Sequence, residues 1–481
     1  MRAWILGGEL RIPLLFVVFL IASALAVPVQ PSDSSNAGGV SPQAKWHIEI
    51  VDSDGEVGLF TSIGLGSDNI PQISYYDRSN EDLKYAKWTE SGWSIETVDF
   101  IGDVGELSSI AVDSANNPHI SYFYDTKDDL KYAKWTGSTW DIEIVDSADA
   151  VGLYTSIALD GSDNPHMSYY GSTNHDVKHA RWTGASWEIR IVDSDGMNPS
   201  ETSIGLDTHD NPHICYQHWT RHDRDLRYAK WTGSGWSTET VDSVGDVGDD
   251  CSIAIDSNDY PHMSYQDETN RDLKYAKWNG STWHIETVDS ADSVGFYTSI
   301  ALDSSDNPRI SYEDLATDSL KYAEWDGSAW HIETVDLLVN SVFYFTSIAL
   351  DTYGNPHISY EDIRNGDLKY ATKADLTPSR SLSIDIDPDI LNLKSKGRWI
   401  TAYLSAENAS VHDIDVSTIL LQDTLVPERW DYQDDVLMLK FNRQEFKDTV
   451  QVSESVQIKI TGKWKDGTEF EAYDSIRVIG P

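Results

Sequence analysis

The chain has 481 residues and carries a formal net charge of −43 at pH 7. This length exceeds what one hydrophobic core organises, so two domains are expected. The acidity argues against nucleic acid as a partner, because nucleic-acid binding needs clustered lysine and arginine. It suits a soluble protein outside the cell.

Residues 1–26 are expected to be a secretory signal peptide. An apolar run at residues 12–27 ends in a small-x-small cleavage site, Ala24-Leu25-Ala26. The run is shorter than the roughly 20 residues that a membrane-spanning helix needs. A retained N-terminal anchor is the alternative, and no other segment is expected to cross a bilayer. Residues 27–45 are rich in Ser, Pro and Gly and are predicted to form a flexible linker.

From residue 46 to 374 the chain repeats one unit of about 47 residues. One copy contains Tyr297-Thr-Ser-Ile-Ala-Leu-Asp303, Asn307-Pro-Arg-Ile-Ser-Tyr312, Leu320-Lys-Tyr-Ala-Glu-Trp325 and Trp330-His-Ile-Glu-Thr-Val-Asp336. These four runs have the length and composition of strands, and turn residues separate them. Four antiparallel strands at this period are typical of one blade of a β-propeller.

The two ends of the array predict that the propeller closes. The first run, 46–52, has the sequence of a fourth strand but no copy precedes it. The last copy ends at 368–373 and lacks its fourth strand. An N-terminal strand that completes the seventh blade would remove two exposed sheet edges.

Positions that recur in most or all of the seven copies have structural explanations. Each second strand begins with proline, where a missing N–H group is tolerated. Paired tryptophans such as Trp88 and Trp93 are predicted to pack at the blade edge. The residue after the proline is histidine in five copies, and we expect it to hydrogen-bond to the blade turns. The alternative is a ring of imidazoles that binds an anion or a metal.

The fourth copy departs most from the repeat, and it supplies the candidate binding site. Its loop between the second and third strands is two residues longer and contains Trp219, beside His218, Arg221 and His222. An exposed tryptophan with polar neighbours is a platform for a sugar ring or a peptide. The alternative is that Trp219 folds back over a neighbouring loop. The two histidines, together with His175 and His179 in the third copy, also raise the question of zinc, although their spacing is weak evidence.

Aspartates are dense in the loops between the fourth strand of one copy and the first strand of the next. Because the strands alternate in direction, these loops and the loops between second and third strands lie on the same face of the propeller. This face is therefore predicted to be acidic. No other cofactor is expected, but calcium could bind carboxylates there. The candidate ligands are Asp52, Asp54, Asp193 and Asp195.

The two cysteines are too few for a disulfide framework. Cys215 replaces a serine and Cys251 replaces a threonine in consecutive copies. They could meet across neighbouring blades, and an exported protein permits a disulfide. The sequence leaves the bridged and the reduced states open.

Residues 379–481 lose the repeat and show six or seven alternating, half-buried strand patterns, which predict an Ig-like β-sandwich domain. The expected fold class is therefore all-β: a seven-bladed β-propeller at 46–374, closed by an N-terminal strand, followed by a C-terminal β-sandwich.

The blade motifs resemble repeat arrays in exported archaeal and bacterial proteins, most of which have no assigned function. They are Thr298-Ser-Ile-Ala-Leu-Asp303, Asn307-Pro-x-Ile-Ser-Tyr312 and Leu320-Lys-Tyr-Ala323. The tail, with Asp385-Ile-Asp-Pro-Asp389, resembles a β-sandwich module of surface proteins. Lectins and sialidases share the propeller architecture, but the chain lacks the Ser-x-Asp-x-Gly-x-Thr-Trp box and an evident arginine triad of the sialidases.

No nucleophile elbow, Cys/His pair, phosphate-binding loop or His-Glu-x-x-His motif occurs. The favoured hypothesis is a non-catalytic recognition or adhesion protein, secreted or at the cell surface, whose propeller loops bind an extracellular glycan or protein. The alternatives are a polysaccharide hydrolase or lyase that uses carboxylates of the acidic face, and a structural component of the cell envelope.

Overall fold

The computed structural model describes residues 45–89, 91–195, 200–219, 223–291, 293–337, 345–373, 381–407, 410–433, 435–465 and 469–480. The expected signal peptide lies outside these residues, as does the linker apart from Lys45. Across the described ranges, no helix is long and apolar enough to cross a membrane.

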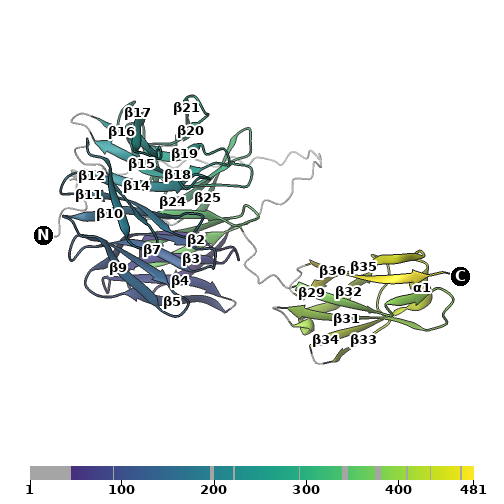
Figure 1. Ribbon diagram of the computed structural model, residues 1–481. Helices are drawn as coiled ribbons and strands as arrows, with labels where there is room; N and C mark the ends of the chain where they lie inside the picture. Colours follow the sequence, from purple (N-terminus) through teal and green to yellow (C-terminus); the bar gives the residue numbers. More distant parts are fainter. Residues whose placement is uncertain are drawn as a thin grey trace, which may run out of the picture. The chain divides into compact units, whose positions relative to one another are not determined.

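The repeat folds as predicted, and the described part of the array forms seven four-stranded antiparallel sheets (Figure 1). Blade 1 consists of β2 (Val57–Leu65), β3 (Pro71–Asp77), β4 (Asp82–Thr89) and β5 (Gly92–Asp99). Blade 2 consists of β6 (Val104–Val112), β7 (Pro118–Tyr124), β8 (Asp129–Trp135) and β9 (Trp140–Asp146). Blade 3 consists of β10 (Val151–Leu159), β11 (Pro165–Gly171), β12 (Asp176–Trp182) and β13 (Trp187–Asp193). Blades 4 and 5 consist of β14 (Ser200–Leu206), β15 (Pro212–Trp219), β16 (Arg224–Trp231) and β17 (Trp236–Asp242), and of β18 (Val247–Ile255), β19 (Pro261–Asp267), β20 (Asp272–Trp278) and β21 (Trp283–Asp289). Blades 6 and 7 consist of β22 (Val294–Leu302), β23 (Pro308–Asp314), β24 (Ser319–Trp325) and β25 (Trp330–Leu337), and of β26 (Thr346–Leu350), β27 (Pro356–Asp362), β28 (Asp367–Thr372) and β1 (His47–Asp52).

The ring closes as the two ends of the array predict. β1 pairs antiparallel with β28, from His47 opposite Thr372 to Asp52 opposite Leu368. The sheet order β1-β28-β27-β26 therefore joins the two ends of the array in one blade. Each first strand also contacts the first strand of the next blade, and β26 contacts β2. The seven first strands thus surround the propeller axis.

The serine that is identical in all seven first strands holds neighbouring blades together. Its hydroxyl oxygen accepts a hydrogen bond from the backbone N–H of an isoleucine in the next blade, 3.2 Å away in every copy. The seven pairs are Ser62–Ile110, Ser109–Ile157, Ser156–Ile204, Ser203–Ile253, Ser252–Ile300, Ser299–Ile348 and Ser347–Ile63. The last pair closes the circle, so this serine is part of the scaffold.

The histidines that follow the proline are also structural. His119 is buried, its Nε2 lies 3.4 Å from the Asp113 carboxylate, and its Nδ1 lies 2.6 Å from the Tyr132 hydroxyl. Since the carboxylate can only accept, Nε2 donates to it and Nδ1 accepts from the tyrosine. Burial lowers the pKa of His119 to about 4, so the ring stays neutral. The prediction of hydrogen bonds to the turns is confirmed here. The Trp88–Trp93 pair also packs as predicted, edge to face with centroids 5.4 Å apart.

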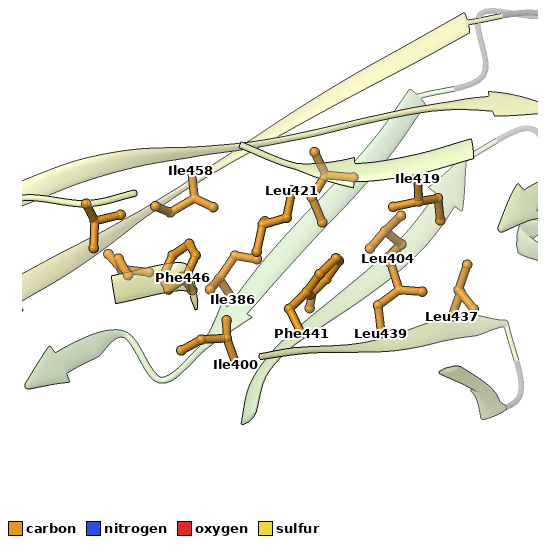
Figure 2. Close-up of a cluster of buried hydrophobic side chains, with 14 of the residues drawn as sticks. Ile386, Ile400, Leu404, Ile419, Leu421, Leu437, Leu439, Phe441, Phe446 and Ile458 are labelled. Atoms are coloured by element: carbon orange, nitrogen blue, oxygen red, sulfur yellow. The ribbon is translucent and has the colours of Figure 1, made fainter. Parts of the chain in front are cut away.

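The C-terminal region forms two further sheets. The first has the order β29-β31-β34-β33 and the second β30-β36-β35-β32. The strands are β29 (Ser381–Asp387), β30 (Ile390–Asn392), β31 (Trp399–Glu407), β32 (Ile414–Leu421), β33 (Arg429–Gln433), β34 (Val436–Asn442), β35 (Ser453–Trp464) and β36 (Glu469–Ile479), with η1 (Val411–Asp413) and α1 (Arg443–Lys447) between strands. Side chains of both sheets, such as Leu439 and Ile458, share one buried core (Figure 2). This arrangement confirms the expected sandwich.

Candidate functional site: the axial cavity beside blades 4 and 5

A bulge in the first strand turns one side chain of each blade toward the propeller axis. In β2 the pairing register with β3 shifts between Leu59 and Ser62, and β6, β10, β18 and β22 show the same shift. The second residue before the serine has φ between 44° and 62° in all seven blades. Such angles are strained for residues other than glycine and occur at functional sites. We call these seven the ring residues: Phe60, Leu107, Tyr154, Glu201, Asp250, Tyr297 and Phe345.

The ring residues line a cavity of about 160 Å³ on the axis, which we call the axial cavity. The residue after each of them completes the lining, for example Thr61 and Thr298. We use loop face for the side that carries the loops between blades and those between second and third strands. Because first strands run from the loop face inward and the ring residues lie in their first half, the axial cavity lies toward the loop face.

Two adjacent blades place carboxylic acids in a ring that is otherwise aromatic or aliphatic. Blades 4 and 5 contribute Glu201 and Asp250. The Asp250 backbone N–H donates to Glu201 Oε2, and the Tyr297 N–H donates to Asp250 Oδ2 at 2.7 Å. Since five blades fold with Phe, Leu or Tyr at this position, the scaffold does not require an acid there.

The electrostatics of the two acids are unfavourable. Burial, followed by the charges of Asp250 and Asp249, raises the pKa of Glu201 well above its usual value. Burial also raises the pKa of Asp250, and the nearby Glu268 carboxylate adds to the effect. Glu201 and Asp250 are half-buried, and neighbouring carboxylates that are partly withdrawn from water share protons more readily than exposed ones.

The acidic group extends outward to blade 4's long hairpin. Burial and a hydrogen bond that the protonated Glu268 carboxyl group donates to Asp249 raise the pKa of Glu268 to about 7. Glu268 also accepts a hydrogen bond from Arg224, whose guanidinium lies 4.4 Å from the centre of the Trp219 ring. A continuous series of contacts therefore joins Trp219 to the acids at the axial cavity.

The candidate ligand residues of blade 4 are only partly described. Trp219 was expected on a loop, and this prediction is wrong because the longer hairpin extends the strands, so that Trp219 ends β15 opposite Arg224. Its Nε1–H donates to Gln217. His218 is buried, and neither ring nitrogen has a hydrogen-bond partner among the described residues. Arg221 and His222 lie outside the described residues, so their role stays a prediction.

The calcium candidates already have partners. The Asp52 carboxylate accepts hydrogen bonds from the Tyr75 hydroxyl at 2.7 Å, the Lys84 ammonium at 2.5 Å and the Asp54 N–H at 3.1 Å. Burial alone would raise the pKa of Asp52, but these hydrogen bonds hold it below its usual value. Calcium binding stays a prediction, and at this position the ion would have to displace a lysine.

Asp193 has the same environment in blade 4. Its carboxylate accepts from Tyr216, from Arg227 at 2.7 Å and from the Asp195 N–H at 3.0 Å. Asp54 and Asp195 are exposed at the following turns. The fourth-strand aspartates therefore act in the scaffold as acceptors for a tyrosine, a cation and a turn.

The two cysteines meet across blades 4 and 5 as the repeat alignment suggested. Their sulfur atoms lie 2.8 Å apart in a buried position, and both are thiols in this structure. In neighbouring blades the same contact joins two hydroxyls, as between Ser168 and Thr202 at 2.8 Å. The cysteines thus replace a serine–threonine pair, and disulfide formation stays a prediction.

Two other places on the propeller have the residues of a possible binding site. Asp207, His209 and Asp259 could together hold a metal ion on the opposite face, but the Asp259 carboxylate already accepts from the Thr208 N–H at 2.8 Å. A larger cavity of about 460 Å³ is lined by Tyr228, Tyr260, Trp278 and others. Tyr228 and Trp278 occur at positions that most of the other blades share. The residues that differ from the repeat are therefore concentrated at the axial cavity and not at either of these two places.

Sequence reasoning missed Glu201 and Asp250. The signal was present, since aligning the seven copies on their common serine shows two acids two residues earlier in consecutive copies. Their importance depended on the bulge, which aims this position at the axis. Strand alternation does not predict that bulge.

No protein-family model and no curated protein matches the chain. Similar solved structures include a protein of unknown function from Dyadobacter fermentans, with 9% identity over 59% of this chain and 96% of the other and a TM-score of 0.42. A mutant of the Aleuria aurantia lectin bound to alpha-methyl-L-fucoside has 10% identity over 62% of this chain and 90% of the other, with a TM-score of 0.41. A Hadza microbial sialidase has 10% identity over 66% and 65%, with a TM-score of 0.38. Likenesses this distant do not identify the ligand of this chain.

Proposed function

We propose that the protein is an exported, non-catalytic recognition protein that binds an extracellular glycan on its loop face, beside blades 4 and 5. One observation carries this proposal: the departures from the repeat gather at one place. The long hairpin with Trp219, the Arg224–Glu268 pair and the two ring acids form connected contacts. Because the other blades fold without them, these residues serve something other than folding.

The chemistry of this place suits a sugar. The aromatic side chains among the ring residues offer flat apolar surfaces that stack on the C–H face of a pyranose. Carboxylates and the hydroxyls of Thr202 and Thr298 can hydrogen-bond to sugar hydroxyls. A cavity with apolar walls and a few convergent polar groups is the usual form of a small-ligand site.

A polysaccharide hydrolase is the second candidate, because Glu201 and Asp250 form a close pair of acids with raised pKa values. Their side chains are hydrogen-bonded to each other. Glycosidases hold their two carboxyl groups about 5 to 9.5 Å apart. The closer pair seen here favours binding over hydrolysis.

A glycan array tests the proposal with the exported chain and its Trp219→Ala variant. Trp430→Ala is the matched control, since Trp430 is 54% exposed and lies in the sandwich. We expect selective glycan binding that Trp219→Ala weakens at least tenfold and Trp430→Ala leaves unchanged. Equal binding by all three proteins would exclude this site, and no binding by the wild type would favour a structural role. Turnover of a bound polysaccharide that Asp250→Asn abolishes would favour the hydrolase.

A further inference from the structure

The axial cavity has an acidic side and an aromatic side. Glu201 and Asp250 form the acidic side. On the other side, the Phe345 ring lies between Phe60 and Tyr297, with centroid distances of 4.5 and 4.7 Å. The acids and the aromatic rings therefore face one small space from different blades.

The acids lack a protein counter-charge. Among the described residues, no lysine or arginine forms an ion pair with Glu201, Asp249 or Asp250. The nearby guanidinium of Arg224 is already paired with Glu268. The fourth-strand aspartates show the contrast, because each of those described above has a lysine or an arginine within hydrogen-bond distance.

A buried acceptor beside the acids also lacks a donor. Gln266 is opposite Asp249 in the β18–β19 ladder, so the two side chains are neighbours on one face of the sheet. Gln266 is 1% exposed, and its Oε1 has no hydrogen-bond partner among the described residues. Its Nε2 donates to the Val294 carbonyl at 3.5 Å, which leaves the oxygen for another donor. Gln266 does not line the axial cavity itself, so its oxygen adds to the acceptor-rich surroundings of the acids, which together favour a ligand rich in N–H donors.

We propose that the axial cavity binds the ammonium group of an amino sugar within the recognised glycan. An ammonium donates three hydrogen bonds and carries the positive charge that the acids lack. The faces of Phe345 and Tyr297 would add cation–π attraction in a partly desolvated site. The cavity of about 160 Å³ is close to the roughly 150 Å³ that takes up one six-membered ring in a protein core. This inference rests on the proposed function and names its ligand class.

The electrostatics of the site support this assignment. Burial raises the pKa of the Tyr154 hydroxyl in the neighbouring blade, and the charges of Glu201, Asp249 and Asp250 raise it further. The charges of the acids therefore act on the next ring residue. A bound cation would relieve the repulsion that now raises the pKa values of these acids. Such a site costs stability when it is empty, which is typical of a binding site and not of a scaffold.

Isothermal titration tests the inference with three oligosaccharides of equal length: glucosamine, N-acetylglucosamine and glucose oligomers. The exported chain is titrated at pH 6.5 in 150 mM salt, which screens long-range attraction. We expect the glucosamine oligomer to bind at least tenfold more tightly than the other two. Glu201→Gln with Asp250→Asn should remove this preference. Asp141→Asn is the charge control because Asp141 is exposed on β9 of another blade, and it should leave the preference intact.

The outcomes separate the two proposals. Equal affinity for the acetylated and the deacetylated oligomers would overturn the amino-sugar assignment and leave glycan recognition standing. Binding of lysine-containing peptides but of no saccharide would overturn both. A preference that survives the double variant, while circular dichroism shows an intact fold, would place the ammonium elsewhere.

Discussion

Replacing Glu361 with glutamine should stabilise the propeller in a manner that depends on pH. Glu361 lies in β27, is 3% exposed, and its Oε2 has no hydrogen-bond partner among the described residues. Burial raises the pKa of Glu361 from 4.5 to about 8, although Arg78 opposes the effect. The folded state therefore favours the neutral acid. The stability that this group contributes is present below pH 4.5 and is lost as the pH rises through 8.

The size of the effect follows from the two pKa values. Each pKa unit corresponds to about 1.4 kcal/mol, so the raised pKa of Glu361 lowers the unfolding free energy by about 3 kcal/mol at pH 7 and by about 5 kcal/mol well above pH 8. Glutamine occupies the equivalent position in blades 4 and 5, as Gln217 and Gln266. Glu361→Gln should therefore fit the blade and remove the cost of ionisation.

Urea unfolding followed by tryptophan fluorescence between pH 4.5 and 8 measures this difference. We expect the variant and the wild type to converge near pH 4.5 and to separate as the pH rises. Asp242→Asn is the control of opposite sign. Burial alone would raise the pKa of Asp242, but hydrogen bonds from Lys274 and Tyr265 lower it, so its contribution is lost as the pH falls. A gap between Glu361→Gln and wild type that does not change with pH would refute this reasoning.

Three further predictions concern the scaffold. Oxidation by dissolved oxygen should join Cys215 and Cys251 in a disulfide, and mass spectrometry should detect the loss of two thiol hydrogens. The disulfide closes a loop of about 37 residues and should raise the unfolding free energy by about 4 kcal/mol. An unchanged mass would contradict this prediction. Ser203→Ala leaves a backbone N–H without its acceptor and should cost about 1 to 3 kcal/mol in urea unfolding; a neutral result would show that this serine is dispensable. Lys131→Met leaves the buried Asp99 without a cation and should cost about 3 to 5 kcal/mol, so a loss below 1 kcal/mol would contradict the role of this pair.

The architecture could be predicted because repetition and physical requirements agree. Seven copies of four strand-like runs specify a propeller, and the unmatched runs at 46–52 and 368–373 specify how it closes. Roles of repeated residues could also be predicted where one contact explains them, as for His119 with its turn aspartate. The partners of the fourth-strand aspartates could not, because Tyr75 and Lys84 approach Asp52 only in the folded blade.

The candidate site was predicted only in part. The sequence singled out blade 4, and Trp219 indeed contacts Arg224 within the connected group of residues. It did not predict that β15 continues to Trp219, since hairpin extension depends on pairing and not on composition. Glu201 and Asp250 were overlooked because a regular strand would not turn them toward the axis, and only the bulge does so.

A crystal structure of the protein with a glucosamine oligosaccharide tests the central claim most directly. The proposal predicts one sugar ring in the axial cavity, with its nitrogen about 3 Å from the Glu201 and Asp250 carboxylates and its face against Phe345 or Tyr297. A saccharide bound instead in the larger cavity lined by Tyr260 and Trp278 would contradict it.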